Sequence, residues 1–184
     1  MADLDELRHR AISGDAHAAC VLAETYLHGN KGAEVDLEKA FLWSEKAAQS
    51  GEVRALTNLG ILYRMGTPWL PRDMERARGT FEAAAERGDM KAPRYLGMMY
   101  RERELPAADA DGEAFQWFQR GAERNDITSQ YYLGEMYEQG IGTEKDMETA
   151  LYWYRKSAER GDKIAEPAMR ALERLNGNSG GERV

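Results

Sequence analysis

A pattern of about 37 residues recurs four times along this chain of 184 residues. The copies start at Asp15, Glu52, Asp89 and Asp126, and a fifth, partial copy starts at Asp162. A repeat of this length is typical of one helix-turn-helix unit, which cannot bury its apolar face alone and must stack on its neighbours. The sequence therefore predicts an all-α solenoid.

The first half of each copy carries a leucine and a tyrosine four residues apart. These pairs are Leu22 and Tyr26, Leu59 and Tyr63, Leu96 and Tyr100, and Leu133 and Tyr137. Residues four apart share one face of a helix, so both are predicted to be core residues. A small residue follows each leucine: Ala23, Gly60, Gly97 or Gly134. Glycine inside a helix costs about 1 kcal/mol relative to alanine, so its recurrence predicts a close approach of the paired helix.

The second half of each copy alternates small residues with large ones, as interlocking helices do. Asp36, Asp73 and Asp146 are the expected N-caps of the second helices. Three copies place a tryptophan at the same point, namely Trp43, Trp117 and Trp153.

The second copy has Gly79 and Thr80 at that point of the second helix, and its tryptophan, Trp69, lies in the turn. We expect the indole of Trp69 to fill the space that Gly79 and Thr80 leave. Truncation to alanine is then expected to cost about 3 kcal/mol or more.

The predicted organisation is a single domain over residues 1–176 with ten helices. It comprises a capping helix at 1–14, repeats at 15–51, 52–88, 89–125 and 126–161, and a second capping helix at 162–176. Residues 177–184 are expected to form a flexible tail.

The fourth copy shows most clearly which family the chain resembles. It contains Leu133-Gly-x-x-Tyr, the turn Gly140-Ile-Gly, and Asp146-x-x-x-Ala-x-x-Trp-Tyr, and it ends on Ala158-x-x-Gly. These residues resemble the Sel1-like repeats, which are relatives of the tetratricopeptide repeats, and the resemblance covers roughly residues 1–176. It implies a right-handed α/α superhelix of about four and a half repeats and a non-enzymatic role as an adaptor or scaffold.

In the tetratricopeptide relatives, residues two, five, nine, twelve and thirteen positions into the first helix face the concave side. Carried over to the second and third copies, and to Tyr131 of the fourth, these positions predict a partner-binding groove. Its residues are Arg54, Ile61, Arg64, Met65, Lys91, Arg94, Met98, Arg101 and Tyr131. In the fourth copy the full set is neutral to acidic: Thr128, Tyr131, Glu135, Glu138 and Gln139.

Five of the groove residues are basic in a chain of net charge -7. This favours a protein or peptide partner that carries carboxylates and apolar anchors. Replacing Arg94 and Arg101 by Glu is then expected to abolish capture of the partner and leave stability intact. The alternative is a solvated face whose arginines pair with neighbouring Glu and Asp.

Composition and the first residues exclude several other classes of protein. A mean hydropathy of -0.69 with 31% charged residues predicts no membrane insertion. The net negative charge argues against general nucleic-acid binding. The start MADLDELRHRAISG has no apolar segment typical of a secretory signal, so a cytoplasmic location is expected. With a single cysteine, the fold is expected to need no disulfide.

One stripe of side chains raises the alternative of a metal site. His17, Cys20, Glu24 and His28 follow one face of the first helix, and the first three could reach one zinc ion. The other interpretation is a polar stripe in which Cys20 is a small, half-buried residue. No cofactor is expected.

Two alternative functions remain. Some Sel1-like proteins are bacterial immunity or inhibitor proteins that neutralise a toxin. A hydrolase or metal-dependent enzyme is the alternative from another class, although no Gly-x-Ser-x-Gly, His-Glu-x-x-His or Walker motif is present.

Overall fold

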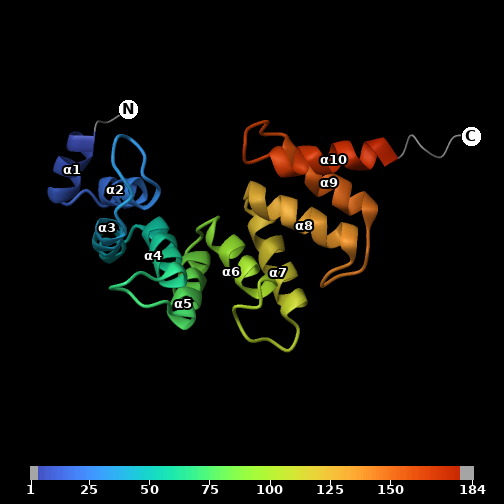
Figure 1. Ribbon diagram of the computed structural model, residues 1–184, viewed down its shortest axis with the longest axis horizontal. Coiled ribbons are helices and arrows are strands. Elements are labelled where there is room, and N and C mark those ends of the chain that lie inside the picture. The colour runs from blue at the N-terminus through green and yellow to red at the C-terminus, as the bar shows by residue number, and fades with distance from the viewer. Residues whose placement is uncertain (1–3, 179–184) are drawn as a thin grey trace, which may run out of the picture. The chain divides into compact units, whose positions relative to one another are not determined.

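The computed structural model describes residues 4–178, and these residues form ten α-helices and no strand (Figure 1). The helices are α1 Leu4–Ile12, α2 Ala16–His28, α3 Leu37–Gln49, α4 Val53–Met65, α5 Met74–Glu86, α6 Ala92–Arg101, α7 Ala110–Glu123, α8 Ile127–Gln139, α9 Met147–Ala158 and α10 Glu166–Asn178. Each predicted repeat holds one pair of helices, which confirms the all-α class and the repeat of helix pairs.

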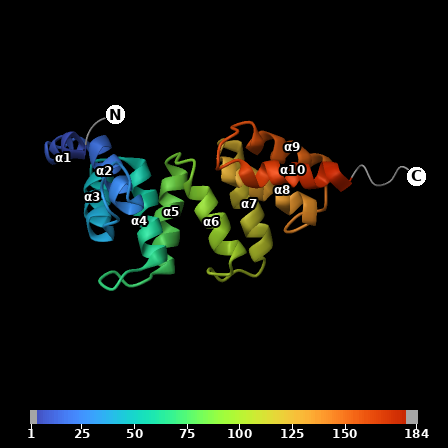
Figure 2. The same ribbon diagram turned by 45° about the horizontal axis from the view of Figure 1, so that its top comes forward.

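The contacts divide the chain into two compact units, Met1–Ala92 and Pro93–Val184. In the first unit, α1 packs on α2, α2 on α3, α3 on α4 and α4 on α5. In the second, α7 packs on α8, α8 on α9 and α9 on α10, and Figure 2 shows these consecutive pairs from another side. The single domain and the right-handed superhelix concern the whole chain and stay predictions.

Aspartates begin most of the helices. Asp15, Asp36, Asp73, Asp109, Asp126 and Asp146 each accept a hydrogen bond from a backbone N–H in the first turn of the helix that follows. Such caps satisfy donors that have no partner within the helix. Glu52 stands at the equivalent point before α4 but makes no such bond with its side chain. The three N-caps predicted for the second helices are therefore confirmed.

The recurring glycines of the first helices lie against aromatic rings of the second helices. A Cβ added at Gly60, Gly97 or Gly134 would lie 2.6, 2.8 or 2.9 Å from the ring of Phe81, Phe118 or Tyr154, respectively. These distances are too short for real side-chain contacts, so the predicted close approach is confirmed. In the first repeat, Ala23 stands at the glycine position and Ser44 at the ring position.

Burial shows which of the predicted core residues form the core. All four leucines of the Leu-Tyr pairs are buried, as are Tyr26 and Tyr100, whereas Tyr63 and Tyr137 are half-buried. The three tryptophans of the second helices are also only half-buried. In the last three repeats the fully buried ring is the residue that follows the tryptophan position: Phe81, Phe118 and Tyr154.

The expectation for Trp69 is wrong. A Cβ at Gly79 would have no atom within 4 Å, so no indole fills the space beside it. Trp69 instead packs edge-on against Phe41 of α3, with ring centroids 5.5 Å apart, and stays 44% exposed. The physical reason is that Gly79 faces solvent, as does Leu42 at the same position of the first repeat, so its lack of a side chain leaves no hole in the core.

The C-terminal capping helix differs slightly from the prediction. It continues through Gly177 and Asn178, where the flexible tail was expected to begin. The rest of that tail, residues 179–184, lies outside the described residues.

Candidate functional site

Four of the predicted groove residues of the first unit lie on α4. Arg54 is partly buried and forms ion pairs with Glu24 of the preceding repeat and with Glu52. Its guanidinium also lies 3.2 Å from the ring nitrogen Nδ1 of His17. Ile61 is half-buried and packs against the core of this unit. Arg64 is half-buried and Met65 is exposed.

The second unit contains Arg94, Met98 and Arg101 on α6 and Tyr131 on α8; Lys91 lies exposed just before α6. Arg94 forms an ion pair of 3.2 Å with Asp126, the N-cap of α8, and also donates a hydrogen bond to Thr128. Arg101 forms an ion pair with Glu135.

Three of the five predicted basic residues, Arg54, Arg94 and Arg101, therefore bind carboxylates of adjacent repeats. The pairing that the alternative interpretation expects is therefore present for these three arginines, although Arg94 is only 17% exposed and does not lie on a solvated face. Their charge is partly neutralised within the protein, so they offer less to an acidic partner than the sequence suggests.

The structure does not bring the side chains of the stripe with Cys20 together as ligands of one metal ion. The thiol of Cys20 is fully buried, and its burial, followed by the charge of Glu24, raises its pKa to about 12. Glu24 is bound to Arg54, the ring of His17 lies 3.4 Å from Glu52, and His28 is exposed. Within residues 4–178, no group of three or more His, Cys, Asp and Glu is placed to hold a metal ion.

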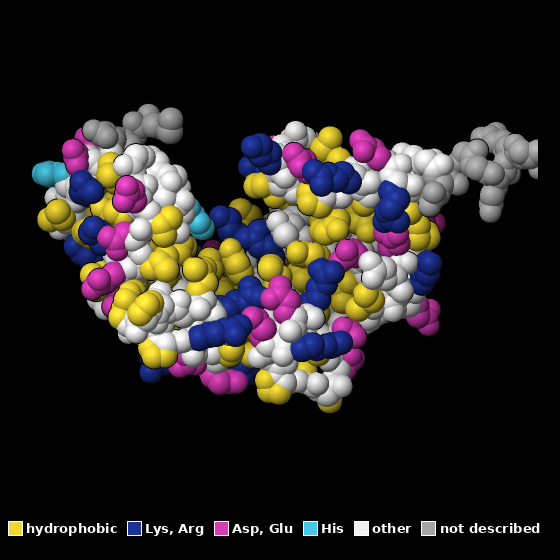
Figure 3. Space-filling model, in the orientation of Figure 1, with side chains coloured by type: hydrophobic (Ala, Val, Ile, Leu, Met, Phe, Trp, Pro, Cys, Tyr) yellow, Lys and Arg dark blue, Asp and Glu magenta, His cyan; other side chains and the backbone are white. Residues whose placement is uncertain are grey.

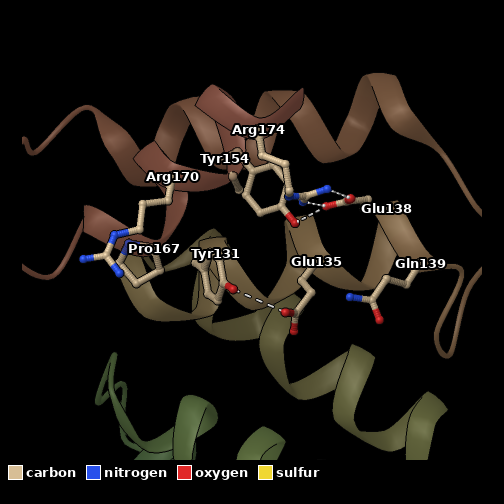
Figure 4. Close-up of a pocket in the computed structure, with 9 residues that line it drawn as sticks. Tyr131, Glu135, Glu138, Gln139, Tyr154, Pro167, Arg170 and Arg174 are labelled. Carbon is tan, nitrogen blue, oxygen red and sulfur yellow. Dashed lines mark hydrogen bonds and ion pairs between the residues drawn. The ribbon is translucent and has the colours of Figure 1, made fainter. Parts of the chain in front are cut away.

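A pocket of about 420 Å³ lies where α8, α9 and α10 meet in the second unit (Figure 4). It is lined by Tyr131, Glu135, Glu138 and Gln139 of α8, Tyr154 of α9, and Pro167, Arg170, Ala171 and Arg174 of α10. On the face shown in Figure 3, basic, acidic and hydrophobic side chains of this unit are interspersed.

The lining residues of α8 and three of those of α10 occupy equivalent positions, counted from the start of their repeats. Tyr131, Glu135, Glu138 and Gln139 lie five, nine, twelve and thirteen residues after Asp126. Pro167, Ala171 and Arg174 lie five, nine and twelve residues after Asp162. The positions carried over from the tetratricopeptide relatives therefore line a real pocket. Of its residues, only Tyr131 was predicted as a site residue. Counting the positions into the fifth, partial copy would have found Pro167, Ala171 and Arg174 of α10, but not Arg170.

Glu138 is the most heavily bonded group in the pocket. Both nitrogens Nη1 and Nη2 of Arg174 donate to its carboxylate oxygens at 2.8 Å, and the hydroxyl of Tyr154 donates at 2.7 Å. The bond from Arg174, assisted by that from Tyr154, lowers the pKa of Glu138. Burial, followed by the bond to Glu138, raises the pKa of Tyr154.

The second carboxylate of the pocket, Glu135, accepts a hydrogen bond of 3.3 Å from the hydroxyl of Tyr131. The side chains of Glu135 and Glu138 are 17% and 14% exposed, whereas those of Arg174 and Arg170 are 52% and 77% exposed. The pocket therefore has an acidic and phenolic floor and a basic rim.

None of the helices in residues 4–178 is long and apolar enough to cross a membrane. The curated proteins include none that matches this sequence.

Two solved bacterial structures share both sequence and fold with the chain. A protective antigen of uropathogenic Escherichia coli strains, described as displaying an SLR fold, is 32% identical with a TM-score of 0.70; the match covers 90% of this chain and 35% of that one. A Sel1 repeat protein from Oxalobacter formigenes is 28% identical with a TM-score of 0.75, over 88% of this chain and 63% of that one. The chain thus spans less than two thirds of the length of either protein.

An immunity protein from Pseudomonas aeruginosa is 18% identical with a TM-score of 0.52, over 90% of this chain and 75% of that one. That likeness shows a shared fold.

The model of the Sel1 repeat matches residues 16–52, 53–89, 94–126 and 127–162. Proteins built from this repeat are generally modules for protein interaction. Because the matches cover most of its length, the chain belongs to the Sel1 repeat family.

Proposed function

We propose that this chain is a non-enzymatic protein-interaction module that binds a protein or peptide through its first-helix face. We define this face as the residues two, five, nine, twelve and thirteen positions after the start of each repeat. The observation that supports the proposal most is the pocket between α8 and α10, because residues at these positions line it. A pocket is the kind of surface that an anchor side chain of a partner can fill.

In the second and third repeats, the proposed contact residues remain those predicted from the sequence. Met65 is exposed and Met98 half-buried, so both can contact apolar anchors of a partner. Because Arg94 and Arg101 are already paired, we expect them to contribute less to capture of an acidic segment than Lys91, which is exposed. We therefore expect the partner to be a protein with apolar anchors, in which acidic residues contribute less to binding.

The toxin-neutralising role stays an alternative from the sequence. The likeness to the Pseudomonas aeruginosa immunity protein is one of fold, so it adds no argument for that role. The cytoplasmic location also stays a prediction.

Site-specific photo-crosslinking in the native cell tests the proposal. The photoreactive residue p-benzoylphenylalanine is placed at Met65 or Gln139, which are exposed on the first helices α4 and α8. Matched controls carry it at Leu42 or Tyr152, which are 57% and 51% exposed on the second helices α3 and α9. We expect the same protein to be cross-linked at the first-helix positions, identified by mass spectrometry and reproduced with purified components. Cross-links confined to Leu42 and Tyr152 would contradict the proposal.

A further inference from the structure

We propose that the pocket between α8 and α10 binds the side chain of an arginine or lysine of the partner, held by Glu135 and Glu138 beside the rings of Tyr131 and Tyr154. This inference rests on the proposed function, because it names the chemistry that the first-helix face recognises in the fourth and fifth repeats.

Negative and positive charges are separated in the pocket. Both carboxylates lie in the floor and are less than one fifth exposed, whereas the guanidinium groups of Arg170 and Arg174 belong to side chains that are more than half exposed. A cation that enters the pocket meets the carboxylates in a partly desolvated place, where ion pairs are stronger than on an open surface. An anion that drew Arg174 away would leave the carboxylate of Glu138 without its ion pair, which is costly.

The carboxylate of Glu135 has unused acceptor capacity. A carboxylate offers about four lone-pair sites. Glu135 uses one for the hydroxyl of Tyr131 and one for Arg101. About half of its capacity is therefore open to a donor that enters the pocket.

Two tyrosine rings form an aromatic wall of the pocket. The rings of Tyr131 and Tyr154 have centroids 5.9 Å apart, and both residues line the pocket. Figure 4 shows their hydroxyl groups directed toward Glu135 and Glu138, so rings and carboxylates bound the same space. A guanidinium or ammonium group beside tyrosine rings gains cation–π attraction in addition to its ion pairs.

Arg174 shows that the pocket accepts a guanidinium group. Its two nitrogens bind the two oxygens of Glu138 in parallel, the geometry in which arginine recognises a carboxylate most specifically. Because the side chain of Arg174 is half exposed, it can turn into solvent while a cation of the partner takes over its bonds with Glu138 and keeps that carboxylate paired. We infer that Arg174 competes with the partner for Glu138.

A titration with short peptides followed by NMR tests this inference on the unmodified chain. The probe is acetyl-Gly-Gly-Arg-Gly-Gly-amide, and the matched control replaces arginine by citrulline, which has nearly the same shape but no charge. We expect the arginine peptide to shift the resonances of Tyr131, Glu135 and Glu138 and to bind about tenfold or more tightly than the citrulline peptide. Its affinity should fall as salt is added. Equal binding of the two peptides, or shifts confined to other residues, would overturn the inference.

Variants then assign the roles of the pocket residues. Arg174→Gln removes the internal competitor, so it should bind the arginine peptide more tightly than the wild type does. Glu135→Gln should bind it at least about fivefold more weakly, because the open acceptor loses its charge. Glu144→Gln, an exposed position in the turn between α8 and α9, serves as a control and should bind as the wild type does. Weaker binding by Arg174→Gln, with α10 still folded by its NMR spectrum, would contradict the competition.

The outcomes separate this inference from the proposed function. If the arginine peptide does not bind but cross-links form at Gln139, the first-helix face is an interface and the pocket chemistry is wrong. If the peptide binds the pocket while cross-links form only on the second helices, the pocket chemistry holds and the proposed face is wrong.

Discussion

The backbone of Gly60 lies against the ring of Phe81, so that a Cβ on Gly60 would stand 2.6 Å from the ring atom Cε1. Alanine is the better helix former, but here its methyl group would push α4 and α5 apart. We expect Gly60→Ala to lower the free energy of unfolding by about 1–3 kcal/mol, the usual cost of overpacking. Urea denaturation of the two proteins measures this difference.

A matched control lies on α5. Gly79 is an exposed helical glycine, and a Cβ there would have no atom within 4 Å. Gly79→Ala should therefore raise the free energy of unfolding by about 0.5–1 kcal/mol, the intrinsic helix preference for alanine. If both substitutions were stabilising, the close approach of the two helices would be refuted.

Two buried serines should respond in opposite ways to removal of their hydroxyl groups. Ser44 and Ser157 are both fully buried, but the hydroxyl of Ser44 has no hydrogen-bond partner, whereas that of Ser157 donates to the carbonyl oxygen of Ile127 at 2.9 Å. Ser44→Ala should be neutral or stabilising, because a buried unpaired hydroxyl costs about 1 kcal/mol or more. Ser157→Ala should destabilise by about 1 kcal/mol. Thermal and urea unfolding of both variants provide the comparison.

Charge reversal at Arg94 should destabilise the protein, contrary to the expectation from the sequence. Arg94 is 17% exposed and bound to Asp126, which is 7% exposed and caps α8. Arg94→Glu places a second carboxylate beside this one and should cost about 3 kcal/mol. Arg160→Glu is the control, since Arg160 and its partner Asp162 are 57% and 39% exposed, and it should cost less than about 1 kcal/mol. Similar losses in the two variants would show that burial of the pair has no effect.

Truncation of Trp69 should cost less than expected from the sequence. Its indole is 44% exposed and has an edge-on contact with Phe41, for which about 1 kcal/mol is typical. Phe81→Ala, which removes a fully buried ring, should cost about 3–5 kcal/mol. The two midpoints of urea unfolding decide the order, and a larger loss for Trp69→Ala would mean that the indole is part of the core.

Stability should decline at high pH in part because of Cys20. Burial raises the pKa of its thiol from near 9 to about 12, so the folded protein keeps the neutral thiol at pH values where the unfolded chain has lost the proton. This contribution is fully present below pH 9 and is lost as the pH rises through about 12. Unfolding measured from pH 8 to 10.5 should therefore show a shallower decline for Cys20→Ala than for the wild type. Parallel declines would show that the thiol is not desolvated.

Much of the fold could be predicted because its determinants are local and repeated. The capping aspartates, such as Asp36 and Asp146, act on helix turns next to them in the chain. The close approach at Gly97 could be inferred from its recurrence, but the ring that meets it could not be identified. The recurring tryptophans suggest Trp117 as the ring that packs against Gly97, but the buried ring there is its neighbour Phe118. The two side chains point in different directions, because one residue along a helix turns the side chain by about 100°.

The candidate site could be predicted only in part. The sequence places Arg94, Arg101 and Tyr131 on the first-helix face, and it shows that the same positions become acidic in the fourth repeat. It does not show that Arg94 binds Asp126 or that Arg174 binds Glu138, because these partners lie 32 and 36 residues apart and meet only when helices stack.

The sequence by itself determined the repeat, the helix pairs, the positions of the caps and the family of this protein, since each of these depends on residues within one turn or one repeat. Only the tertiary structure decided which charges are neutralised, that Cys20 is desolvated, that Trp69 packs on Phe41, and that a pocket opens between α8 and α10. These properties depend on the distances between side chains of adjacent repeats, and periodicity fixes which helices meet without fixing which side chains touch.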